Sequence, residues 1–63
     1  MDTKITKQYI QEVAYYLQNA KSCLDDALSS VEKNENKEQI QNTIKSVDGA
    51  LQNVTTTLSN YKD

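Results

Sequence analysis

The chain has 63 residues, 25% of them charged, with a formal net charge of −2 at pH 7. That length allows one small domain but not an ordinary two-layer core. There is no proline and only one glycine, so the residues that usually form tight turns between strands are nearly absent. Long helices are therefore favoured. Histidine is absent as well, which removes the commonest general base and metal ligand.

The sequence contains no segment suited to a membrane or to export. No apolar run approaches the length of a transmembrane helix, and the first residues lack the apolar stretch of a secretory signal. The single cysteine, Cys23, cannot form a disulfide within its own chain, which suits a reducing compartment. We therefore expect a cytoplasmic protein without a membrane partner.

The first expected element is a helix over residues 3–33. Its apolar residues recur at alternating spacings of three and four, the pattern of a coiled-coil seam. The residues of this seam are Ile10, Val13, Leu17, Ala20, Leu24, Ala27 and Val31.

A turn is expected next, over residues 34–36, within the only turn-like cluster of the chain. Asn34 tolerates the left-handed backbone of a helix end. Asn36 followed by Gln39 has the spacing of a capping box, which places the start of the next helix at Lys37.

The second helix is expected over residues 37–61, and its seam mirrors the first. Facing residues have numbers that add up to 71 in all seven layers, as expected when a chain folds back on itself. The sequence therefore predicts a single all-α domain, 1–63, with the fold of an antiparallel two-helix hairpin. The seam residues of this second helix are Ile40, Ile44, Val47, Leu51, Val54, Leu58 and Tyr61.

The first helix carries more apolar surface than the second can cover, because apolar residues also flank its seam on both edges. One seam stabilises a 63-residue hairpin only marginally. The simplest solution is a second copy, giving a homodimeric four-helix bundle; another protein could instead cover the same surface. The residues expected at the self-association interface are Tyr9, Tyr16, Ala20, Cys23, Ala27 and Leu28.

Opposite the seam, Tyr15 stands alone on a polar face of the first helix. Tyrosine is enriched at interaction hot spots, although isolated surface tyrosines are also ordinary. This face is a second candidate for binding a partner. Its residues are Gln8, Gln11, Glu12, Tyr15, Gln18 and Asn19.

The sequence gives little reason to expect catalysis. Cys23 has no neighbouring base, and Asp25 and Asp26 diverge by about 100° on a helix, so they cannot share one proton or ion well. We expect no enzyme activity, no cofactor, no metal and no small-molecule substrate. The expected function is that of a protein-binding module: a regulator, adaptor or inhibitor, of the kind found among small phage and plasmid proteins.

Two alternatives remain open. In length and hairpin topology alone, the chain resembles the Rop-type dimeric RNA-binding bundle, and this resemblance implies RNA contacts along the first helix. The acidic charge, the scattered lysines and the lack of arginine make nucleic acid an unfavourable partner. The other alternative is a purely structural assembly subunit. The RNA-contact candidates are Lys4, Lys7, Gln11, Gln18 and Lys21, with Tyr15 stacking on a base.

Overall fold

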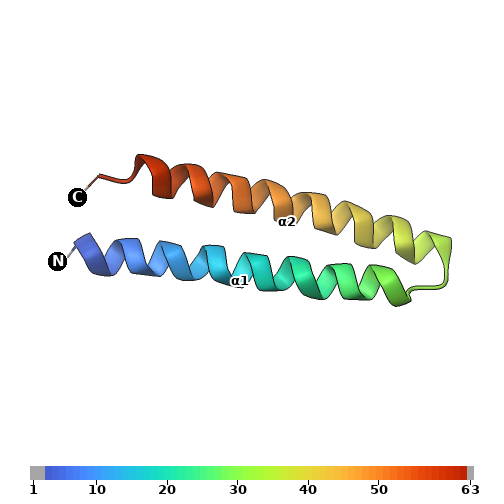
Figure 1. The fold of residues 1–63 in the computed structure, drawn as a ribbon. Coiled ribbons are helices and arrows are strands. Elements are labelled where there is room, and N and C mark those ends of the chain that lie inside the picture. Colours follow the sequence, from blue (N-terminus) through green and yellow to red (C-terminus); the bar gives the residue numbers. More distant parts are fainter. Residues whose placement is uncertain (1–2, 63) are drawn as a thin grey trace.

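The computed structural model describes residues 3–62, and the side chains of residues 5–62. It consists of two helices, α1 (Thr3–Ser30) and α2 (Asn34–Asn60). The helices lie side by side and run in opposite directions, so that the start of α1 and the end of α2 meet at one end of a rod 49 Å long (Figure 1). The described part of the chain has no strand, and the predicted all-α helical hairpin is confirmed.

The link between the helices lies three residues earlier than the sequence indicated, at residues 31–33 instead of 34–36. The hydroxyl of Ser29 donates to the carbonyl of Asp25, and the hydroxyl of Ser30 donates to that of Asp26. The same bonds form within α2, for example from Thr43 to Gln39, so they do not by themselves end a helix. The amide of Val31 still donates to the carbonyl of Ala27 at 3.0 Å, and the helix ends there.

The expected capping box at Asn36 is not formed, because α2 already begins at Asn34. The residue that caps α2 is Lys33, whose extended backbone (φ −83°, ψ 131°) directs its carbonyl to the amide of Lys37 at 3.0 Å. Asn34 is not left-handed, since no described non-glycine residue has a positive φ. The earlier start brings Glu35 into the first turn, where a carboxylate interacts favourably with the helix dipole.

The predicted seam residues line the contact between the helices, but no described residue is fully buried. Eleven of the twelve large seam residues are half-buried, and Val13 is the exception at 47% exposed. Two helices touch along a narrow line, so a seam residue on one edge of that line can keep part of its side chain in water. Ala14, on the opposite edge of the α1 seam, is half-buried instead.

An ion pair joins the two helices across the seam. The Nζ of Lys21 on α1 lies 2.8 Å from Oδ1 of Asp48 on α2. In the predicted register Lys21 stands level with Ala50, about half a helical turn from Asp48, and a lysine side chain spans that offset. The pairing that the seams predicted therefore agrees with the contact between the helices. Within the described residues, neither helix is long and apolar enough to cross a bilayer.

Candidate interaction surface

The seam divides the surface of the hairpin into two sides that differ in charge. Because Lys21 and Asp48 bond across the seam, they show which flank of α1 adjoins which flank of α2. Successive helical residues turn by about 100°, so the opposite flanks must adjoin each other on the other side. We call the side of that bond the ion-pair side and the other the uncharged side.

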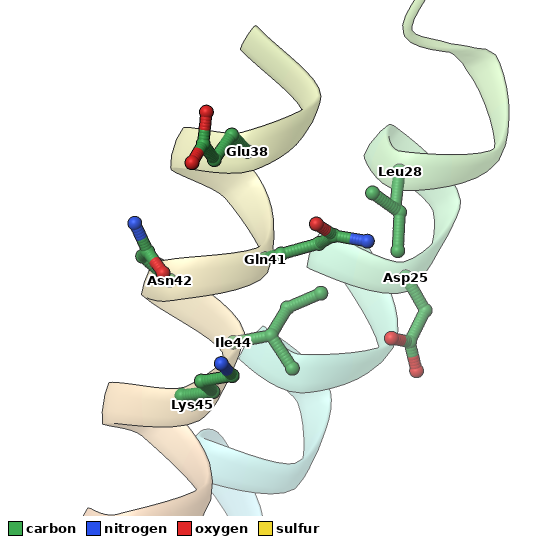
Figure 2. A pocket seen from close by; sticks show the side chains of 7 residues that line it. All are labelled: Asp25, Leu28, Glu38, Gln41, Asn42, Ile44 and Lys45. Carbon is green, nitrogen blue, oxygen red and sulfur yellow. The ribbon is translucent and has the colours of Figure 1, made fainter. Parts of the chain in front are cut away.

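The ion-pair side holds an open groove between the helices, with a volume of about 510 Å³. In Figure 2, Gln41 reaches from α2 across the groove toward Leu28 of α1, and Ile44 lies beneath it. Leu28 is half-buried here, so it lies apart from the other residues predicted for self-association. The residues that line the groove are Asp25, Leu28, Glu38, Gln41, Asn42, Ile44 and Lys45.

The ion pair also affects titration on this side. Hydrogen bonding and charge attraction from Asp48 raise the pKa of Lys21 above its ordinary value of 10.5. Lys21 is therefore already engaged within the hairpin, which weakens its candidacy as a phosphate contact. Lys7 is half-buried, and the side chain of Lys4 lies outside the described residues.

The uncharged side carries a row of large exposed apolar residues on the first half of α1. Tyr9 and Tyr16 are 64% and 67% exposed, and Ile5 and Val13 are 44% and 47% exposed. The same row continues toward the link with three small residues, of which Cys23 is exposed. We call this row the tyrosine stripe; its residues are Ile5, Tyr9, Val13, Tyr16, Ala20, Cys23 and Ala27.

Beside the tyrosine stripe, α2 contributes small uncharged residues, chiefly Thr43, Ala50 and Thr57. The hydroxyl of Thr43 donates to the carbonyl of Gln39 at 2.9 Å, and that of Thr57 donates to the carbonyl of Asn53 at 3.0 Å. These donors are satisfied within the helix, so covering them leaves no unpaired hydroxyl proton. This flank of α2 can therefore be buried at low cost.

All six residues of the polar face around Tyr15 are exposed, as expected for positions opposite the seam. The Tyr15 ring, itself 64% exposed, meets the ring of Tyr16 edge to face, with centroids 6.1 Å apart. The contact links the polar face to the tyrosine stripe, because Tyr16 belongs to the latter.

The described side chains provide no cluster of three or more metal-ligating residues. The exposure of Val13 was not expected from sequence. The seam spacing by itself places Leu28 on the edge of α1 opposite Tyr9 and Tyr16, so its inclusion with them in one interface was inconsistent with that spacing. Comparison with protein-family models, curated proteins and solved structures finds no match to this chain.

Proposed function

We propose that this protein acts without catalysis, as a protein–protein interaction module that uses the tyrosine stripe of α1 as its binding surface. The observation that carries the proposal is the location of the five large hydrophobic side chains that are exposed among residues 5–62. All five lie between Ile5 and Tyr16 on α1, and four of them share the tyrosine stripe. A contiguous apolar patch of this kind marks a binding surface more often than free solvent-facing surface.

The composition of the stripe suits recognition of a protein. Tyrosine buries a large area while only two side-chain torsions are fixed, and it is enriched at the centres of protein interfaces. The absence of charged residues from the stripe means that no ion must be desolvated when a partner covers it. Regulators, adaptors and inhibitors act through such surfaces.

Nucleic-acid binding is the weaker alternative, and the ion pair of Lys21 is the reason. An RNA-binding face needs free cations gathered together, whereas Lys21 is engaged by Asp48. A purely structural subunit would bind copies of itself and nothing else, whereas an interaction module that self-associates through the stripe keeps the exposed polar face around Tyr15 for another protein.

The decisive experiment places a photoactivatable phenylalanine analogue at one position at a time in cells of the source organism. With the analogue at Tyr16, on the stripe, we expect covalent capture of protein. With it at Gln52, exposed on α2 away from the uncharged side, we expect only background. Equal capture at both positions would refute the proposal.

The RNA alternative is tested with fluorescently labelled RNA hairpins at 50 mM and 200 mM salt. We expect no binding at either concentration. Saturable binding that weakens at least tenfold at the higher salt, and that is lost in Lys21→Gln, would favour the alternative.

A further inference from the structure

We propose that the partner covering the tyrosine stripe is a second copy of the chain, with the two α1 helices antiparallel and crossing at Tyr16. The two hairpins would then form a four-helix bundle. This inference rests on the proposed function, because it names the occupant of the same surface.

The exposed area of the chain is the first argument for a second copy. The hairpin exposes 5088 Å², whereas a compact monomer of this size exposes about 4,100 Å². The excess of about 1,000 Å² is close to the ~800 Å² that each partner loses in an interface of standard size. A dimer would thus bring the chain to the surface expected of a folded protein.

The low charge of the tyrosine stripe is the second argument. In a two-fold dimer a residue faces a different residue of the other copy, and only residues on the axis face themselves. The tyrosine stripe carries no charge, and Glu12 at its edge faces Ala20 of the other copy instead of another carboxylate. A dimer formed through the ion-pair side would instead have to desolvate Lys21, Lys45 and Asp25.

The gradient of side-chain size along the stripe determines the direction of packing. The stripe is large in its first half and small in its second, with Tyr16 at its centre. Antiparallel packing about Tyr16 places Tyr9 against Cys23 of the other copy and Ile5 against Ala27 of the other copy. Large residues then fill the space left by small ones, as close packing requires. Parallel packing would oppose large to large at one end and leave gaps at the other.

A further geometric condition for a four-helix bundle is that α1 can contact two helices at once, its own α2 and the other α1. On α1, Tyr16 lies about 100° around the helix from the adjacent seam residue Leu17, so α1 can touch its own α2 and the other α1 in different directions. Val13, Ala20 and Ala27 belong to both surfaces and lie between the two contacts. The two-fold operation brings the flank of α2 around Thr57 toward its own copy. Since the Thr57 hydroxyl is already bonded to Asn53, this second contact leaves no unpaired donor.

Disulfide crosslinking tests both the dimer and its direction, using purified chains oxidised with copper phenanthroline. Tyr16→Cys in a Cys23→Ser background places one thiol at the crossing point, and we expect a crosslinked dimer. Gln18→Cys in the same background, on the outward face, is the matched control, and we expect monomer. Sedimentation equilibrium of the unmodified chain should show a dimer.

The native cysteine, Cys23, tests whether the two α1 helices pack antiparallel. In the antiparallel dimer the two copies of Cys23 are 14 residues apart along the axis, about 21 Å, which no disulfide spans. The unmodified chain should therefore resist crosslinking, whereas Tyr9→Cys, with Cys23 retained, should crosslink. A second pair, Ile5→Cys with Ala27→Cys in the Cys23→Ser background, should crosslink too and keeps both stripe tyrosines.

Each contrary result has a distinct meaning. Efficient crosslinking of the unmodified chain through Cys23 would overturn the antiparallel direction. A monomer in sedimentation, together with background crosslinking of Tyr16→Cys, would overturn the dimer. If photocapture at Tyr16 then still yields a different protein, the proposed function stands without this inference; if it yields nothing, both fail.

Discussion

The two sides of the hairpin share the same seam but differ in how they are completed. On the ion-pair side, side chains join the two helices across an open groove: Lys21 bonds Asp48, and Gln41 reaches toward Leu28. On the uncharged side, Tyr9 and Tyr16 remain about two-thirds exposed. The comparison shows that one chain can satisfy its polar flank by itself, whereas its apolar flank needs another molecule.

The largest expected effect comes from breaking the seam on which both sides depend. Leu24→Asp places a carboxylate at a half-buried position between the helices, and we expect it to destabilise the hairpin by at least ~2 kcal/mol. Circular dichroism during thermal unfolding measures this loss. Leu24→Met keeps the volume and should remain folded; similar melting of both variants would contradict the seam.

The next effect tests the uncharged side by adding the same charge to the tyrosine stripe and to the outward face of α1. Tyr16→Glu puts a carboxylate at the crossing point of the proposed dimer, where it meets its own copy. We expect the dissociation constant to rise at least tenfold, about 1.4 kcal/mol. Gln18→Glu, exposed and away from the stripe, should leave it unchanged. Sedimentation equilibrium gives both constants, and an equal response would contradict the stripe as the interface.

A smaller effect is expected at Gly49, which lies on the outward face of α2 and on neither side of the seam. Gly49 lies within α2, has no positive φ, and an added Cβ meets nothing within 4 Å. Gly49→Ala should therefore stabilise the helix by about 1 kcal/mol without altering association. Urea unfolding measures the first quantity and sedimentation the second. A change in association would mean that the outward face of α2 contributes to the interface.

The smallest effect concerns the ion pair. Because Asp48 raises the pKa of Lys21 in the folded chain, the pair stabilises the hairpin below pH 10.5 and ceases to do so as the pH rises through the raised value. The stability difference between the unmodified chain and Lys21→Gln should be small and should vanish at alkaline pH. Lys45→Gln, which removes a charge outside that ion pair, should show no such loss; thermal unfolding between pH 8 and 11.5 provides the measurement.

The helices, their antiparallel pairing and their register were determined by the sequence alone, because a seam with spacings of three and four leaves few ways to pack. Leu24 and Val47 are half-buried as expected for that reason. The link was predicted three residues too late, because the Asn34–Asn36 cluster resembles a turn but forms the first residues of α2.

Only the tertiary structure decided how deeply each residue beside the seam is covered. Periodicity places a residue on a face of its own helix, and antiparallel seams that face each other then fix which flanks adjoin, but burial depends on how closely the helices approach along their length. That approach left Val13 47% exposed and Ala14 half-buried, and it opened the groove beside Leu28.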